Sequence, residues 1–179
     1  MTTLNVPVTQ RDHAKGPANA PVTLVEYGDY ECPHCGLAHP IVKLIHQHFG
    51  QRLRFVFRHF PLGQAHPNAE SAAQTAEFAG AHGKFWEMHD SLYGNQDRLG
   101  LPLYLALAGI LELPELELRN ALVEGTYVPK VRADFLSGVR SGVNGTPCFF
   151  INGVRHDGTY ALEDLGAAIE QQLRVSVPI

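Results

Sequence analysis

The sequence predicts an α/β protein in which a central mixed β-sheet is flanked by helices and carries an all-helical insertion. Three observations support this prediction. Near the N-terminus a strand pattern, a helix pattern and a second strand pattern follow one another within about 35 residues. About 75 residues with helical spacing of apolar side chains and no strand pattern come next. Two short strand patterns joined by a tight turn, and then an amphipathic helix, complete the chain.

The N-terminal third contains the strand–helix–strand unit. Residues 1–20 are polar and irregular, which is typical of a surface lead-in. The β-branched and aromatic run over 22–27, bounded by a proline and a glycine, predicts a buried strand. Apolar residues at helical spacing predict a helix over 33–49. Residues 52–58 alternate in polarity and predict a second strand, parallel to the first, with Arg58 among the arginines on its wet face.

The rest of the chain predicts helices first and a hairpin afterwards. Helical segments are expected over 69–79 and near 83–93, 102–111, 114–124 and 127–140. Phe149–Ile151, the turn pair Asn152-Gly153 and residues 154–156 predict an antiparallel hairpin. Residues 162–173 predict the final helix.

These patterns divide the chain into three parts. Residues 1–20 form the lead-in, residues 21–62 and 142–175 together form the main domain, and residues 63–141 form an inserted helical domain. The 179 residues and their 45% hydrophobic content suit one compact unit with an insertion.

Charge and hydropathy exclude several function classes. The net charge of -4 offers no general attraction to a phosphate backbone, so no nucleic-acid partner is expected. No apolar run approaches the roughly 20 residues that cross a bilayer, so no membrane segment is expected. The start lacks a basic region followed by an apolar stretch, which predicts a cytoplasmic protein. A periplasmic location is the alternative if an export signal is missing from the sequence.

The three cysteines are too few, in a chain of this size, for a disulfide scaffold. Cys32 and Cys35 are separated by two residues, and their disulfide would close a ring too small to stabilise the fold much by restricting the unfolded chain. This spacing therefore favours thiol–disulfide exchange over a structural cross-link.

The Cys-Pro-His-Cys segment lies where the first strand ends and the first helix begins. Pro33 suits the first helical position, which makes Cys32 the N-cap and turns the helix N–H groups toward its sulfur. Such a cysteine has a pKa of roughly 3.5 to 7.5. His34, when protonated, would tune the same thiolate. Cys35, one turn into the helix, would be the shielded thiol that resolves a mixed disulfide.

These features together resemble the DsbA-like branch of the thioredoxin-fold oxidoreductases, over about residues 14–172. The matching features are the strand before Cys-Pro-His-Cys, the proline five residues after Cys35, the helical insertion, and Gly145-Thr146-Pro147 before a strand. The resemblance implies a thioredoxin fold and a cis peptide bond at Pro147, with the Thr146 backbone exposed to an extended substrate. It also implies protein or peptide thiol and disulfide substrates, a redox recycling partner, and no metal or organic cofactor.

Two further residues are candidates for the site. Glu26 lies in an otherwise apolar strand, where desolvation would raise its pKa and suit it to relay the proton of Cys35. The family also has an acidic residue at this place. Cys148 departs from the usual family pattern, in which the residue after the cis-proline is not a cysteine. It is either a packed small hydrophobe or an accessory thiol that pairs with the active cysteines or accepts a glutathione cap.

Two alternatives to catalysis remain open. One is a zinc site that combines the cysteine pair with His34, His39 or Cys148, although no second ligand pair has the usual spacing. The other is a redox-inert thioredoxin-like module that binds extended segments through the Pro147 loop. Within the redox interpretation the direction is also open, because the motif suggests an oxidant whereas the cytosol keeps thiols reduced.

Overall fold

The computed structural model describes residues 2–175 and contains one mixed five-stranded sheet with the order β1-β3-β2-β4-β5. The central pair, β2 (Val22–Gly28) and β3 (Leu53–His59), is parallel, and every other pair is antiparallel. The remaining strands are β1 (His13–Lys15), β4 (Cys148–Ile151) and β5 (Val154–His156). The predicted parallel unit and hairpin are both confirmed.

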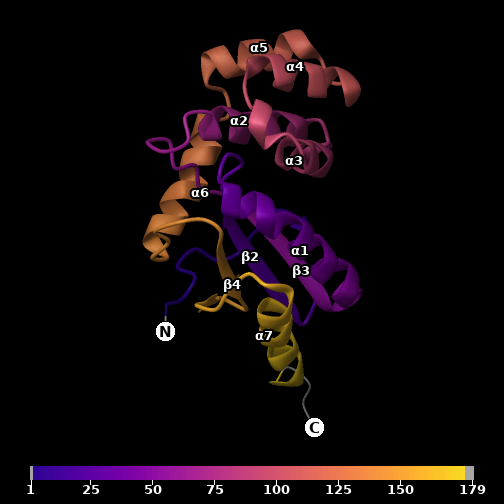
Figure 1. Ribbon diagram of the computed structural model, residues 1–179, viewed down its shortest axis with the longest axis vertical. Helices are drawn as coiled ribbons and strands as arrows, with labels where there is room; N and C mark the ends of the chain where they lie inside the picture. The colour runs from indigo at the N-terminus through magenta and orange to yellow at the C-terminus, as the bar shows by residue number, and fades with distance from the viewer. Residues whose placement is uncertain (1, 176–179) are drawn as a thin grey trace.

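Helices cover both faces of this sheet and extend beyond one end of it (Figure 1). Helices α1 (Pro33–Phe49) and α7 (Leu162–Val175) pack on one face, and α6 (Val128–Arg140) covers the other. The other helices are α2 (Ala69–Ala81), α3 (Phe85–Tyr93), α4 (Leu101–Ile110) and α5 (Glu115–Glu124), with short 3-10 turns η1 (Gly50–Arg52) and η2 (Gln96–Arg98). Each predicted helical segment is present within a few residues of its expected bounds.

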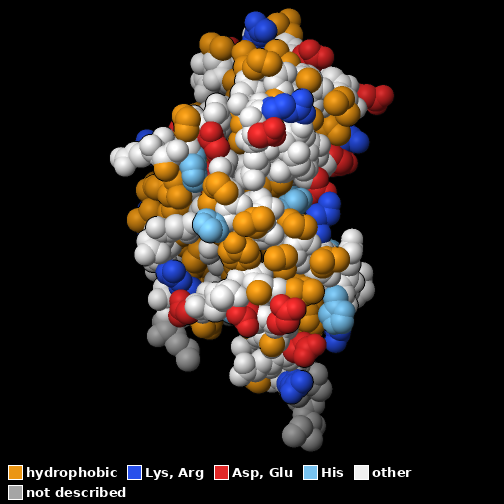
Figure 2. All heavy atoms as spheres, viewed as in Figure 1, with side chains coloured by type: hydrophobic (Ala, Val, Ile, Leu, Met, Phe, Trp, Pro, Cys, Tyr) orange, Lys and Arg blue, Asp and Glu red, His pale blue; other side chains and the backbone are white. Residues whose placement is uncertain are grey.

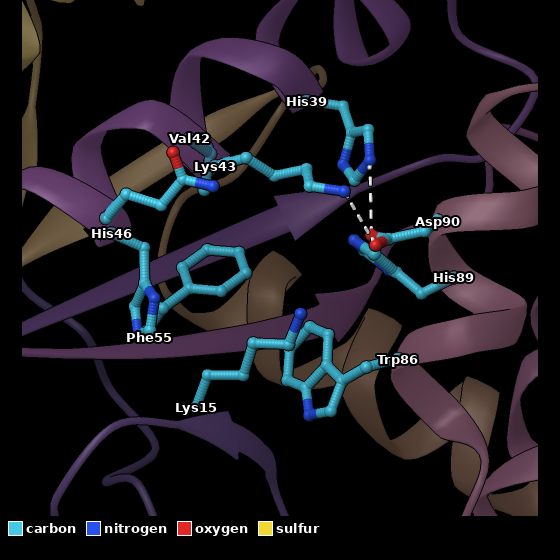
Figure 3. A pocket seen from close by; sticks show the side chains of 10 residues that line it. Lys15, His39, Val42, Lys43, His46, Phe55, Trp86, His89 and Asp90 are labelled. Atoms are coloured by element: carbon cyan, nitrogen blue, oxygen red, sulfur yellow. Dashed lines mark hydrogen bonds and ion pairs between the residues drawn. The ribbon is translucent and has the colours of Figure 1, made fainter. Parts of the chain in front are cut away.

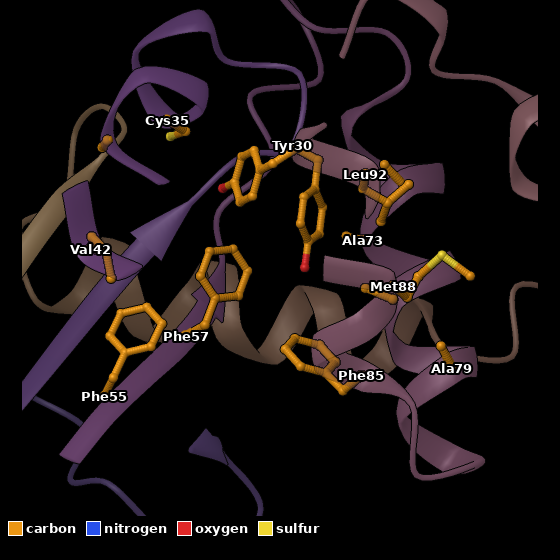
Figure 4. Packing of buried hydrophobic residues seen from close by; sticks show 14 of the residues in the cluster. Tyr30, Cys35, Val42, Phe55, Phe57, Ala73, Ala79, Phe85, Met88 and Leu92 are labelled. Atoms are coloured by element: carbon orange, nitrogen blue, oxygen red, sulfur yellow. The ribbon is translucent and has the colours of Figure 1, made fainter. Parts of the chain in front are cut away.

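The hydrophobic core runs without a break from the sheet into the helices of the insertion. One cluster contains Phe55 and Phe57 of β3 together with Phe85, Met88 and Leu92 of α3 (Figure 4). Both central strands are buried at six of their seven positions, as expected for parallel strands covered on both faces. The helical segment is therefore packed directly against the strands that carry the candidate site.

The lead-in prediction is wrong for three of its residues. His13–Lys15 form an edge strand, with His13 opposite Phe57 and Lys15 opposite Phe55. The strand is recruited by free backbone groups at the edge of β3, and such pairing leaves little trace in a polar three-residue sequence.

The prediction that Arg58 lies on a wet strand face is also wrong. Its side chain is buried, and Nε donates to the Asp12 carboxylate at 2.7 Å. The other guanidinium N–H groups donate to the carbonyl oxygens of Val6 and Pro7 and to the Tyr27 hydroxyl, each at 2.9 Å. The N-terminal segment folds over β3 and supplies the acceptors that make a buried guanidinium tolerable.

No helix within the described residues has the length and apolar character needed to span a bilayer.

Candidate active site

Cys32 occupies the predicted N-cap of α1. Its backbone is extended, with φ -72° and ψ 121°, and Pro33 takes the first helical position. The Cys32 carbonyl accepts the first intrahelical hydrogen bond from Gly36, at 3.1 Å, and its N–H donates to the Asp29 carbonyl at 3.2 Å. The sulfur is therefore held at the end of the helix where backbone N–H groups are free to stabilise negative charge.

The loop before β4 closes over this sulfur. The Cys32 Sγ atom lies 3.4 Å from the Thr146 carbonyl oxygen, and the Thr146–Pro147 peptide bond is cis. Two segments that are 114 residues apart in the sequence therefore meet at Cys32.

The two active-site thiols have pKa values that change in opposite directions. The pKa of Cys32 falls from 9.0 to about 5, chiefly because the Cys35 thiol donates a hydrogen bond to its sulfur; the backbone N–H groups of His34 and Cys35 add to this against the effect of burial. Burial raises the pKa of Cys35 well above its ordinary value, and the hydrogen bond to Cys32 raises it further. Cys32 is thus a thiolate at neutral pH, whereas Cys35 keeps its proton.

This low pKa predicts the pH dependence of Cys32 alkylation. The thiolate is the reacting form, so we expect the rate of modification by iodoacetamide to reach half its maximum near pH 5 and to be flat at neutral pH. Thiolate absorbance in the ultraviolet should give the same midpoint. A Cys148→Ala variant should leave the curve unchanged, whereas a midpoint close to 9 in either protein would contradict the stabilised thiolate.

Glu26 lies on β2, on the side of the sheet that faces Cys35. It is 2% exposed and sits between Phe57 of β3 and Phe149 of β4 in the strand register. Burial, and then the negative charge of Cys32, raise its pKa to about 8. One carboxyl oxygen, Oε1, has no hydrogen-bond partner among the described residues. The carboxyl therefore holds a proton at neutral pH and can exchange it within the physiological range.

Gln96, from the 3-10 turn η2 of the helical segment, fixes the turn that carries Cys32. Its amide nitrogen donates to the carbonyl oxygens of Tyr30, at 2.8 Å, and Cys32, at 2.9 Å. Gly36 makes room for this contact, because a Cβ at position 36 would lie 1.9 Å from the Gln96 side-chain oxygen. A glycine inside a helix is a sequence signal of such a close approach, but it does not identify the partner.

Asp29 anchors a second loop beside the site. Its buried carboxylate accepts hydrogen bonds from the backbone N–H of Glu31 (2.8 Å) and Leu62 (2.9 Å) and pairs with His66 Nδ1 at 2.7 Å. Burial lowers the pKa of His66, but the hydrogen bond and charge of Asp29 outweigh this and the net pKa is raised, with a further contribution from Cys32. Asp29, His66 and Gln96 are not among the site residues that the sequence predicts.

The His34 imidazole contacts Tyr160. Its Nδ1 atom lies 3.2 Å from the Tyr160 hydroxyl, in an exposed position. The contribution of His34 to the low pKa of Cys32 comes from its backbone N–H.

Cys148 lies on the opposite face of the sheet from the active-site pair. It packs in a cluster with Tyr27, Phe60 and Phe150, whereas Cys32 and Cys35 belong to the cluster on the other face. Its pKa is raised by burial. This placement agrees with the packing interpretation and separates Cys148 from the exchange site by the sheet itself.

Two groups of side chains within the described residues bring candidate metal-ligating atoms within 4.8 Å of one another. The first comprises His39, His89 and Asp90, at a cavity of about 100 Å³ (Figure 3). The Asp90 carboxylate already pairs with the Lys43 ammonium at 2.7 Å, so a fixed cation is present there.

The second group comprises His13, His59 and Glu77. Both imidazoles lie 2.8 Å from the same Glu77 oxygen, and the Lys130 ammonium lies 3.8 Å from it. Neither group contains a cysteine.

Comparison with known proteins agrees with this geometry. Residues 8–171 match the thioredoxin family model. The structure superposes on alpha-DsbA1 from Wolbachia pipientis with a TM-score of 0.84, at 21% identity over 97% of this chain and 96% of that one. A thioredoxin-like oxidoreductase from Silicibacter pomeroyi gives a TM-score of 0.78, at 25% identity over 93% and 94% of the two chains.

A curated relative has a different kind of name. The chain is 46% identical to "Na(+)/H(+) antiporter NhaA 1" of Salinispora arenicola over 167 residues, which cover 93% of this chain and 26% of the antiporter. The chain thus spans about a quarter of the length of the curated relatives it matches. The family match covers most of the chain, and the fold is the DsbA-like form of the thioredoxin fold. The chain belongs to the thioredoxin family.

Proposed function

We propose that this chain is a thiol–disulfide oxidoreductase that exchanges disulfides with protein or peptide substrates through Cys32 and Cys35. The observation that carries the proposal is the asymmetry of the pair, in which one sulfur is a stabilised thiolate and its neighbour is a buried thiol. Exchange needs one sulfur that attacks or is attacked and a second that resolves the mixed disulfide.

The residues around the pair have distinct roles in this reaction. A substrate thiolate attacks the Cys32 sulfur of the disulfide form, Cys35 leaves as a thiolate and is protonated, and Cys32 is joined to the substrate. A second substrate thiolate then displaces Cys32, which leaves as the stabilised thiolate. Glu26 exchanges the proton with Cys35, and the Thr146 backbone beside Pro147 is available to an extended substrate segment.

The stabilised Cys32 thiolate favours the oxidising direction. Whatever stabilises the reduced form makes the disulfide form a stronger oxidant. The electrons move between thiols and disulfides only, so the proposed reaction uses a redox recycling partner and needs no metal or organic cofactor. The activity that we assign to this chain is thiol–disulfide exchange, and not the transport named for the longer relatives.

The exposed surface along α1 suits apolar substrate segments. Leu37 and Leu44 of α1 and Leu162, the first residue of α7, are exposed, and a groove of about 460 Å³ separates the C-terminal half of α1 from α7. Hydrophobic side chains gather on this face of the molecule (Figure 2). Exposed apolar surface of this kind is typical of contact with unfolded or extended chains.

The test is the reduction potential of Cys32–Cys35, measured by equilibration with glutathione buffers, thiol trapping and mass determination. We expect a value closer to that of DsbA, about -120 mV, than to that of thioredoxin, about -270 mV. The Cys148→Ala variant should give the same value, because Cys148 lies across the sheet.

Each other result has a definite meaning. A thioredoxin-like potential would reverse the proposed direction and favour a reductase in the cytosol, whereas an oxidising one favours a compartment outside it. A pair that does not equilibrate with glutathione at all would refute the exchange function and support the redox-inert module.

A further inference from the structure

Two buried polar atoms beside the redox pair have no hydrogen-bond partner among the described residues. They are Glu26 Oε1 and the hydroxyl oxygen of Tyr93. A buried hydroxyl without a partner costs stability, so an uncompensated one calls for a physical reason. The neighbouring Tyr30 shows the usual solution, because its hydroxyl pairs with His89 Nδ1 at 2.9 Å.

Tyr93 lies between α1, which carries Cys35, and the face of β2 that carries Glu26. Its ring stacks on His39 of α1 at 4.8 Å between centroids, and His39 lies one helical turn after Cys35. The hydroxyl oxygen reaches β2, where a Cβ on Gly28 would lie 2.9 Å from it. Gly28 and Glu26 are two residues apart on that strand and therefore share a face.

Cys35 and Glu26, on either side of this hydroxyl's surroundings, become charged only during exchange. Burial raises the pKa of Tyr93 well above 10.0, and the charges of Cys35 and Glu26 raise it further. The phenol therefore keeps its proton and acts as a donor while either neighbour is ionised. In the resting reduced protein both neighbours are neutral at pH 7, which leaves the donor without a charged acceptor.

We propose that the Tyr93 hydroxyl is the hydrogen-bond donor to the negative charge that passes between Cys35 and Glu26 when a mixed disulfide is resolved. This inference rests on the proposed exchange. The mixed disulfide removes the Cys32 charge that helps to raise the pKa of Glu26, so a larger share of Glu26 is ionised at this stage. In the step, the ionised Glu26 carboxylate takes the Cys35 proton, and the Cys35 sulfur attacks the Cys32 sulfur. The Cys32–Cys35 bond forms, the bond from Cys32 to the substrate sulfur breaks, and the substrate thiolate takes a proton from water.

The experiment is Tyr93→Phe, with Tyr104→Phe as the matched control. The Tyr104 hydroxyl lies in the same helical segment but pairs with Ser71 and the Asn68 carbonyl, at 3.1 and 3.3 Å. Reduced protein is mixed with glutathione disulfide, and two rates are followed by mass: formation of the Cys32–glutathione adduct, and its resolution by Cys35.

In Tyr93→Phe we expect resolution to slow about tenfold or more, while adduct formation stays within about twofold of wild type. The melting temperature should not fall, because the variant removes an unpaired buried hydroxyl. Tyr104→Phe should leave both rates unchanged. Unchanged resolution in Tyr93→Phe, or equal slowing of both steps, would overturn the role of Tyr93. Failure of wild-type protein to form or resolve the adduct would instead overturn the proposed function.

Discussion

Cys32→Ser is expected to reduce thiol–disulfide exchange to the rate of the buffer alone. Cys32 is the sulfur that the structure holds as a thiolate, with a pKa of about 5. Cys35 cannot replace it, because this thiol is fully buried and its pKa is raised. Cys148 lies on the far face of the sheet, and its pKa is raised. The measurement is the rate at which a reduced two-cysteine peptide is oxidised, or at which insulin disulfides are reduced, with a glutathione buffer as recycling system.

Cys35→Ser is the contrasting variant. It keeps the reactive sulfur and loses the resolving one, so we expect it to accumulate a stable mixed disulfide between Cys32 and the substrate, visible by mass. The two variants should therefore fail at different steps. Exchange that persists in Cys32→Ser would remove Cys32 from the mechanism and with it the proposed function.

The parts of this site that could be predicted from sequence are those set by local chemistry. Proline is favoured at the first position of a helix, and a helical pattern follows Pro33, so the N-cap position of Cys32 follows from local sequence. Glu26 stands out for a similar reason, as a carboxylic acid in an apolar run whose strand character is clear. The contact of Thr146 with Cys32 came from the family resemblance, since nothing local joins residues 114 positions apart.

The residues that sequence reasoning missed all act over long distances in the chain. Gln96 and Tyr93 come from the helical segment, where an amide and a phenol carry no signal of the residues they will contact. Arg58 shows the limit of alternation as a guide, because polarity predicts a wet face only when no other segment covers it. The short strand β1 was also missed, because its pairing with β3 uses backbone groups that every sequence possesses.

Glu26→Gln is expected to stabilise the reduced protein at alkaline pH. The folded pKa of Glu26, about 8, lies above its ordinary value of 4.5. A group with a raised folded pKa contributes stability that is present below pH 4.5 and lost as the pH rises through 8. At about 1.4 kcal/mol per pKa unit, the free energy of unfolding of wild type falls by roughly 5 kcal/mol over that range. The amide has no proton to lose, so the free energy of unfolding of the variant should exceed that of wild type by several kcal/mol above pH 8.

The same substitution should slow exchange, because a glutamine cannot accept the Cys35 proton. Stability and activity would thus move in opposite directions, as expected for a buried ionisable group retained for function. The measurement is urea unfolding of reduced protein from pH 4.5 to 9, together with the rate at which Cys35 resolves the glutathione adduct.

The control and the redox state make this test specific. Glu70→Gln changes an exposed carboxylate on α2 and should leave the pH dependence of wild type unaltered. Cys32 has the opposite linkage, because its lowered pKa gives stability above pH 9 that is lost as the pH falls through 5, but this contribution cancels when variants are compared at one pH. In the disulfide form the Cys32 charge is absent, so the advantage of Glu26→Gln should shrink there. If Glu26→Gln instead follows wild type at every pH, Glu26 is an ordinary carboxylate and the proton relay must be assigned to another group.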